Sequence, residues 1–445
     1  MADWHGATAA DLGRGIGAGR LDPLDLAEGI LDAIDLHPQG AAIYARTTRA
    51  RALAEAGAAR ARARSGLRRG LLDGVPLSWK DLYDSAGTAT EAGTAMLAGR
   101  VPEADCDILA NATAGGSVCL GKTHMSEIAF SGLGYNPVTA TPPNVHDARL
   151  LPGGSSSGAA ASVAFGLAPA AVGSDTGGSI RLPSAWNDLV GYKPSFGTLP
   201  MRGALPLCAS FDVAGPLARS VEDAAEVVAL LGGTRPVDLA GASVAGARLL
   251  VLGSVVGEDV DEAPAAAFAG AVERLAAAGA RITHARADWI ARAWDLAGVL
   301  YPAEAWAFWR DLVAEKGHLM YHQIRSRIGA GEGIAAADWI AARDELHALR
   351  QRFAGWAAPF DAILCPTAPI LPPETALVAA DVDYYQRVNL RTLRNTRFGN
   401  LFDLCGISLP TGTLSCGLLL NGLAGCDGRL LRLAAGAERV LGRAA

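Results

Sequence analysis

The sequence predicts an α/β fold in which a large, twisted, mixed and mostly parallel sheet is covered by helices on both faces. From residue 74 onward, short apolar segments typical of buried strands alternate with helical patterns and glycine turns. Such alternation is typical of parallel strands that are joined through helices. The predicted strands are Val75–Trp79, Ser117–Leu120, Pro169–Gly173, Arg248–Leu252, Arg281–His284 and Asp361–Cys365.

Helical patterns occupy the start of the chain and the segments between these strands. Residues 1–66 keep apolar positions at helical spacing, and the Ala-rich segment Ser156–Gly166 predicts a buried helix. A further helix is expected over Pro264–Ala278, because proline suits a first helical turn and Gly279 follows the last one. Residues 290–357 are expected to be mostly amphipathic helix.

The organisation of the chain predicts one domain over residues 1–445. No internal repeat, low-complexity tract or Pro/Ser-rich linker divides it. Within this domain we expect an N-terminal helical segment (1–66), a glycine-rich core that carries the chemistry (70–230), and a remainder that supplies further sheet, helices and pocket walls (231–445).

The composition excludes several classes of protein. Of the 445 residues, 50% are hydrophobic and 19% are charged, which excludes an intrinsically disordered chain. The net charge of −6 argues against a general binder of nucleic acid or of anionic membranes. Only four of the 39 basic residues are lysines, which draws attention to Lys80.

Cysteine usage and the N-terminal sequence predict a cytoplasmic location. The seven cysteines contain no C-x-x-C pair, and most lie in apolar segments, as free thiols do in a reducing compartment. The first 19 residues include several charged side chains and lack the apolar core of a signal peptide. No segment has the length and flanks of a membrane span.

Two Gly/Ser turns are the densest chemical signal in the sequence. They are Gly153–Gly158 and Gly173–Ser179, and each precedes a helix. Neither matches a phosphate-binding loop, because no lysine follows the glycines. Ser156 lies at the centre of a formal G-x-S-x-G match, but Pro152-Gly153 stands where a nucleophile elbow needs a strand. Helix capping by serine would explain either turn alone, but not both together.

Four motifs in order resemble those of the amidase signature family. The resemblance is close over residues 70–230 and looser elsewhere, and Lys80 precedes Ser155 by 75 positions, with Ser179 a further 24 along. The motifs are Gly74–Asp81, Gly121–Glu127, Gly153–Gly158 and Ser174–Pro183. The resemblance implies the amidase signature fold and hydrolysis of a C–N bond by a serine hydrolase.

The family uses a Ser–cis-Ser–Lys triad, which the resemblance assigns to Ser179, Ser155 and Lys80. Ser179 would attack the amide carbonyl and form an acyl-enzyme. Ser155 would relay its proton to Lys80, which burial can keep neutral. The cis peptide of the family would here join Gly154 to Ser155.

Further site residues follow from the same resemblance. The oxyanion hole would be formed by the backbone amides of Thr176, Gly177, Gly178 and Ser179. We interpret Asp175 and Arg181 as a structural ion pair, and Ser156 and Ser157 mainly as helix caps. Candidate substrate contacts are Phe130, Gly132 and Gly154, with the segment Phe130–Asn136 at the entrance.

The expected substrate is a small amide or ureido compound, with no cofactor, no metal and no nucleic-acid or membrane partner. His318 and His322 are four residues apart, but the glutamate of an H-E-x-x-H site is missing, so we interpret them as solvated or substrate-facing. Carboxylated ureas and aryl or indole acetamides stay open. The oligomeric state also stays open, with a homodimer or a small accessory subunit as the alternatives.

A second hypothesis is the catalytic A-type subunit of an aminoacyl-tRNA amidotransferase complex, which belongs to the same family. A catalytically inactive scaffold is a third, and the intact triad disfavours it. The chain departs from the family at residues 144–147, Asn-Val-His-Asp in place of Asn-Pro-Trp-Asp, and over residues 417–428. Both departures are expected to affect the choice of substrate.

Overall fold

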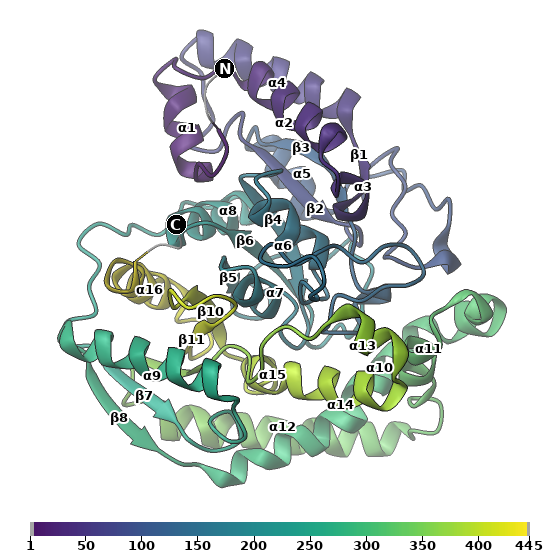
Figure 1. Cartoon of the computed structure of the whole chain (residues 1–445), viewed down its shortest axis with the longest axis vertical. Coiled ribbons are helices and arrows are strands. Elements are labelled where there is room, and N and C mark those ends of the chain that lie inside the picture. Colours follow the sequence, from purple (N-terminus) through teal and green to yellow (C-terminus); the bar gives the residue numbers. More distant parts are fainter. Residues whose placement is uncertain (1–3, 443–445) are drawn as a thin grey trace.

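The computed structural model describes residues 4–442 and confirms the predicted α/β fold with a single mixed sheet (Figure 1). Its strands run in the order β1-β3-β2-β4-β6-β5-β10-β11-β9-β7-β8. They are β1 (Tyr44–Thr47), β2 (Pro76–Lys80), β3 (Val118–Thr123), β4 (Ala170–Asp175), β5 (Val190–Lys193), β6 (Val213–Ala218), β7 (Arg248–Leu252), β8 (Arg281–Ala285), β9 (Ala362–Pro366), β10 (Cys405–Pro410) and β11 (Gly417–Gly422).

Helices connect most of these strands. They are α1 (Ala9–Gly17), α2 (Pro23–Leu36), α3 (Gly40–Ile43), α4 (Arg49–Arg64), α5 (Asp107–Ala114), α6 (Ser157–Ala164), α7 (Arg181–Trp186), α8 (Val221–Gly232), α9 (Glu262–Ala277), α10 (Arg292–Lys316), α11 (His322–Gly329), α12 (Ala336–Ala357), α13 (Thr375–Ala380), α14 (Val382–Thr392), α15 (Arg394–Leu401) and α16 (Asp427–Leu441). No helix within residues 4–442 combines the length and the apolar composition that crossing a bilayer requires.

Parallel pairing occupies two parts of the sheet, one on each side of its centre. Strand β2 pairs in parallel with β3 and β4, and β7 pairs in parallel with β8 and β9. The β7–α9–β8 unit is the β–α–β unit that the sequence predicted. The central pairs β4–β6, β6–β5, β5–β10, β10–β11 and β11–β9 are antiparallel, as is the edge pair β1–β3, so the described sheet is mixed with more antiparallel than parallel pairs. A short turn joins β10 directly to β11, and such a hairpin can only be antiparallel.

Helices cover both faces of the sheet. This follows from the strands, since successive residues of one strand belong to different clusters of buried side chains. Ala171 of β4 packs in one cluster with Ala159 and Ala160 of α6. Its neighbours Ala170 and Val172 belong to the large cluster on the opposite face. The two-sided burial explains why the strands read as continuous apolar segments rather than as alternating ones.

The N-terminal segment differs from the prediction in one element. Residues 1–66 were expected to be helical, but Tyr44–Thr47 forms β1, an edge strand antiparallel to β3. Tertiary pairing decides this conformation, and the Tyr44 hydroxyl donates to the Leu167 carbonyl oxygen at 3.0 Å. Helices α1, α2 and α4 lie together at the end of the molecule opposite β7 and β8 (Figure 1).

Candidate active site

Lys80 and Ser174 meet because their strands run in parallel. The register of β2 and β4 places Trp79 beside Val172, so Lys80 and Ser174 follow at the same edge of the sheet. The Lys80 Nζ donates hydrogen bonds to Ser155 Oγ at 2.7 Å and to Ser174 Oγ at 2.8 Å. The predicted contact between Lys80 and Ser155 is therefore present.

The environment of Lys80 favours a neutral amine. Its side chain is fully buried, and this burial lowers the pKa of the amine to about 7, although the Asp212 and Asp175 carboxylates act in the opposite direction. Burial also raises the pKa of the Asp212 carboxyl to about 6. A buried lysine with this pKa can accept a proton near neutral pH.

Ser155 lies in the turn before α6, which backbone hydrogen bonds hold in place. The Gly154–Ser155 peptide bond is cis, as the family resemblance implied. Ser126 N–H donates to the Ser155 carbonyl oxygen at 3.1 Å. A side chain at Gly154 would collide with the backbone of a neighbouring segment, because its Cβ would lie 2.7 Å from Gly134 N. Only glycine fits this close approach.

The two serines that follow Ser155 do not cap α6 with their side chains. Ser156 occupies the N-cap position without a capping hydrogen bond, and its Oγ donates to the Ser174 carbonyl oxygen at 3.2 Å. The Ser157 Oγ is buried without a hydrogen-bond partner. The capping interpretation was therefore wrong for both hydroxyls, because the Ser156 hydroxyl bonds to β4 and the Ser157 hydroxyl bonds to nothing among the described residues.

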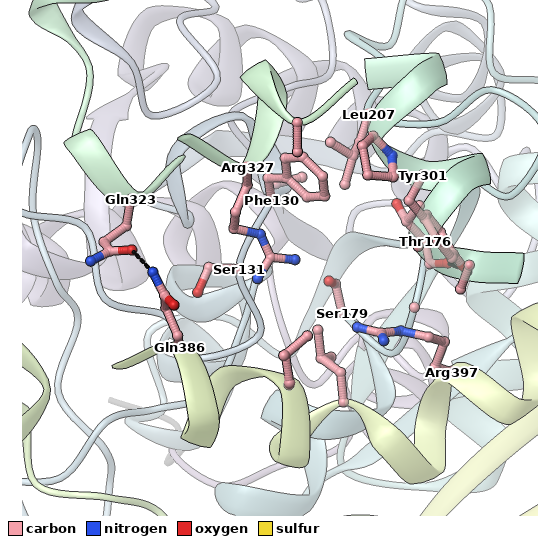
Figure 2. A pocket seen from close by; sticks show the side chains of 18 of the residues that line it. Phe130, Ser131, Thr176, Ser179, Leu207, Tyr301, Gln323, Arg327, Gln386 and Arg397 are labelled. Atoms are coloured by element: carbon pink, nitrogen blue, oxygen red, sulfur yellow. Dashed lines mark hydrogen bonds between the residues drawn. The ribbon is translucent and has the colours of Figure 1, made fainter. Parts of the chain in front are cut away.

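Ser179 lies in the loop between β4 and α7, next to the Ser155 turn. The loops are joined by Ser156 N–H, which donates to the Ser179 carbonyl oxygen at 3.3 Å. The Ser179 hydroxyl points into a cavity (Figure 2). Among residues 4–442 no hydrogen bond joins Ser155 Oγ to Ser179 Oγ, so this part of the expected triad geometry is not formed in the free protein.

A buried ion pair holds the Ser179 loop. The Arg181 Nη2 lies 2.8 Å from Asp175 Oδ1, and both side chains are fully buried. Burial alone would raise the pKa of the Asp175 carboxyl, but the Arg181 charge outweighs this effect and holds that pKa at about 2. Asn400 Nδ2 donates to the same carboxylate at 2.9 Å. The pair is structural, as the sequence predicted.

The same carboxylate occupies one of the four predicted oxyanion donors. Gly178 N–H donates to Asp175 Oδ1 at 2.8 Å. The N–H groups of Thr176, Gly177 and Ser179 have no acceptor among residues 4–442. Three backbone donors beside the Ser179 hydroxyl can stabilise a developing negative charge.

The cavity at Ser179 has a volume of about 400 Å³ and mainly apolar walls. Helices α10 and α11 form one side of it, and α14 and α15 form the other (Figure 2). It is lined by Ala129, Phe130, Ser131, Thr176, Gly177, Ser179, Leu207, Trp294, Ala297, Gly298, Tyr301, Pro302, Gln323, Ser326, Arg327, Ala330, Gln386, Leu390, Leu393 and Arg397.

Of the three predicted substrate contacts, only Phe130 lines this cavity. Gly132 and Gly154 are bound to each other instead, since Gly154 N–H donates to the Gly132 carbonyl oxygen at 2.7 Å. They shape the turn and do not form the wall. Neither residues 144–147 nor residues 417–428 line the cavity, so an effect of these departures on the choice of substrate stays a prediction.

The predicted histidine pair and the buried Lys122 lie outside the cavity. His318 and His322 are exposed, and residues 4–442 contain no cluster of three or more side chains that could hold a metal ion. Lys122 lies 3.5 Å from Asp81 in a buried ion pair. Tyr301 belongs to the buried core and also lines the cavity, and its hydroxyl donates to the Thr176 carbonyl oxygen at 3.0 Å.

Sequence reasoning missed three polar residues of the site. Ser174 precedes Asp175 in a recognised motif, and the parallel pairing of its strand with β2 could have pointed to it. Arg327 and Arg397 line the cavity from α11 and α15. They carry no local signal, because nearly all basic residues of this chain are arginines.

Comparisons with known proteins identify relatives over most of the chain. The family model described as Amidase matches residues 25–431. A 2-amino-5-chloromuconic acid deaminase of Comamonas testosteroni is 34% identical over 390 residues, 84% of this chain and 83% of that protein. The A-type subunit of a glutamyl-tRNA(Gln) amidotransferase from Anaeromyxobacter dehalogenans is 39% identical over 229 residues, 52% of this chain and 46% of that protein. A crystal structure of an amidase, 29% identical, has a TM-score of 0.88 and covers 98% of this chain and 100% of that one.

Proposed function

Because the chain belongs to the Amidase family and is a hydrolase of carbon–nitrogen bonds, we propose that it hydrolyses a small amide or ureido substrate through an acyl-enzyme on Ser179. The observation that carries this proposal is the buried Lys80 amine, with its pKa near 7 and its hydrogen bond to Ser155. The products are ammonia or an amine and a carboxylic acid, or a carbamic acid where the substrate is a ureido compound.

The proton path runs from Ser179 through Ser155 to Lys80. As Ser179 Oγ attacks the carbonyl carbon, its proton moves to Ser155 Oγ, and the Ser155 proton moves to the neutral Lys80 Nζ. The same path returns a proton to the departing nitrogen when the C–N bond breaks. Water then attacks the acyl carbon by the same route and releases the acid. Catalytic hydrogen bonds often tighten only when substrate binds, and we propose this for Ser155 and Ser179.

The negative charge of the tetrahedral intermediate would be bound by the Thr176, Gly177 and Ser179 amides. These donors are fixed before the reaction, because the Asp175–Arg181 pair holds their loop. Preorganised donors of this kind stabilise a transition state without reorganisation during the reaction.

The test compares serine variants of the two neighbouring loops, the Ser155 turn and the Ser179 loop. Ser179→Ala and Ser155→Ala should each remove nearly all turnover in an assay for released ammonia over a panel of amides. Ser157→Ala is the matched control, because this buried hydroxyl beside the Ser155 turn contacts no partner and should be dispensable. A serine-reactive phosphonyl fluoride should label Ser179, located by peptide mass spectrometry. Labelling of Ser155 in place of Ser179 would refute the assignment.

A second candidate is the A-type subunit of an aminoacyl-tRNA amidotransferase, favoured by the similarity to such a protein. That similarity covers about half of this chain and less than half of the relative. Purification of the protein without a partner, together with hydrolysis of small amides by the isolated chain, would favour the first candidate. Stable co-purification with a second protein, with activity only in its presence, would favour the second.

We further propose that the chain works as one domain in the cytoplasm. The sheet takes β1 from residues 1–66, β2 to β6 from residues 70–230 and β7 to β11 from the remainder, which supports a single folding unit. All seven cysteines are free and six of them are buried, in keeping with a reducing compartment. A single cooperative unfolding transition seen by two probes would test the first point.

A further inference from the structure

Two guanidinium groups face the Ser179 cavity without a hydrogen-bonding or anionic partner among the described residues. Arg327 and Arg397 make no side-chain hydrogen bond and no ion pair with any residue of the described chain, 4–442. Arg327 packs over the ring of Phe130 at 4.6 Å, and its Nε is buried without an acceptor. Arg397 lies 5.9 Å from the centre of the Tyr301 ring.

Their surroundings are positively charged and apolar. No aspartate or glutamate is among the residues that line this cavity. Burial lowers the pKa of the Arg327 guanidinium to about 10, and the nearby charge of Arg397 adds to this effect. Burial also lowers the pKa of Arg397. Arginine nevertheless keeps its proton at neutral pH in proteins, so two positive charges share one small cavity.

Arg327 and Arg397 are only partly exposed, and a partly buried charge without an anionic partner is costly. The fully buried Arg181 is matched by Asp175 and Asn400. An arginine that has no anionic partner in a cavity wall is therefore expected to bind an anion from outside the chain. Arginine suits a carboxylate best, because its planar fork matches the two oxygens.

The two arginines lie on opposite sides of the reacting hydroxyl. Figure 2 shows the Arg327 and Arg397 guanidinium groups directed toward Ser179 from opposite walls. Arg397 borders the oxyanion loop, since a methyl group built on Gly177 would lie 3.7 Å from Arg397 Nε. A substrate bound at Ser179 would therefore have a positive charge on either side.

We propose that the substrate is an anionic amide, and that Arg327 and Arg397 bind its carboxylate group or groups. This inference rests on the proposed hydrolysis at Ser179. The apolar walls, including Trp294 and Leu393, hold the short carbon skeleton between the charges. Neutral amides of the same length would leave both guanidinium groups unpaired and bind poorly.

The first experiment compares matched amides that differ in one carboxylate. Succinamate is compared with butyramide, and glutaramate with pentanamide, by kcat/KM for ammonia release. The unaltered enzyme should prefer the carboxylates by about 10- to 100-fold, as one or two charge-assisted hydrogen bonds provide. Arg327→Gln and Arg397→Gln should reduce this preference mainly through KM. Arg325→Gln is the matched control, because this exposed arginine of α11 does not line the cavity.

The second experiment measures binding without turnover. Succinate should quench the fluorescence of the cavity residue Trp294 in the Ser179→Ala variant, whereas succinamide at the same concentration should not. High salt should weaken the succinate effect, because the attraction is electrostatic. Methylphosphonate is included to distinguish carboxylate from phosphonate anions, and stronger binding of methylphosphonate would overturn the assignment to carboxylates.

The outcomes separate this inference from the proposed hydrolysis. If Ser179 is labelled and neutral amides react as well as their carboxylated partners, the inference is refuted and the hydrolase mechanism stands. An equal loss of kcat for neutral and charged amides in Arg397→Gln would also refute it, because Arg397 would then act on the oxyanion. If no amide reacts and Ser179 resists labelling, the mechanism fails. In that case the succinate-binding experiment still tests the inference. Failure of succinate to bind would refute it.

Discussion

The rate at which Ser179 becomes acylated is expected to follow the neutral fraction of Lys80. With a pKa of about 7, roughly half of the Lys80 amine is neutral at pH 7, about a tenth at pH 6 and about a hundredth at pH 5. The logarithm of the acylation rate should therefore rise by about one per pH unit from pH 5 and level off above pH 7. Lys80→Arg should be nearly inactive, because a guanidinium does not release its proton in this range.

Ser174→Ala perturbs this titration without touching Ser179 or Ser155. The variant removes one of the two hydroxyl oxygens that accept from Lys80 Nζ. Hydrogen bonds stabilise a charged donor more than a neutral one, by about 1 kcal/mol, which corresponds to roughly 0.7 pH unit. Loss of this acceptor should therefore lower the Lys80 pKa, and the inflection of the profile should move to lower pH by about this amount.

Ser78→Ala is the matched control for this shift. Ser78 lies on the same strand as Lys80 and is equally buried, but its hydroxyl is paired with Ser162 Oγ at 2.8 Å. Its removal should cost some stability and leave the inflection near pH 7. Both variants thus lose one buried hydrogen bond between side chains, and only one of them should change the titration.

The assay is the rate of Ser179 labelling by a phosphonyl fluoride between pH 5 and pH 9, alongside kcat/KM for an amide. Asp212 and Asp175 are the carboxylates that act on Lys80, and only the Asp212 carboxyl, with a pKa of about 6, titrates in this range. Asp212→Asn separates its contribution from that of the lysine. An inflection that stays in place in Ser174→Ala, or a rate that is constant from pH 5 to pH 8, would refute the role of Lys80.

Three further predictions concern the loops around the site. Gly178→Ala should reduce kcat by about 100-fold, because its Cβ would lie 1.9 Å from Thr396 Oγ1 and shift the oxyanion loop; unchanged steady-state kinetics would contradict this. Arg181→Met should lower the free energy of unfolding by about 3–5 kcal/mol in urea titrations, since it leaves Asp175 buried and unpaired. Burial raises the pKa of Glu127 to about 7, so the folded state binds the extra proton and stability should fall as the pH rises from about 4.5 to 7. Glu127→Gln should flatten that slope in urea titrations at pH 5 and pH 8, and an unchanged slope would exclude Glu127 as its source.

Much of the fold could be predicted because its signals are local. Strand β7 has the predicted bounds Arg248–Leu252, and helix α9 ends within one residue of the expected position. Strands β5, β6 and β10 were not predicted as separate elements. Their pairing is antiparallel and joins segments far apart in the sequence, as in the contact between β5 and β10. Short buried segments give no sign of such partners.

The sequence by itself determined the choice of the proposed reacting residues, since Lys80, Ser155 and Ser179 each stand in a motif with recognisable neighbours. Only the tertiary structure decided what surrounds them. Ser174 approaches Lys80 because two strands run in parallel. Arg327 and Arg397 reach the same cavity from separate helices, 70 positions apart in the sequence. A charge is unpaired only in relation to everything packed around it, and this relation exists only once the chain has folded.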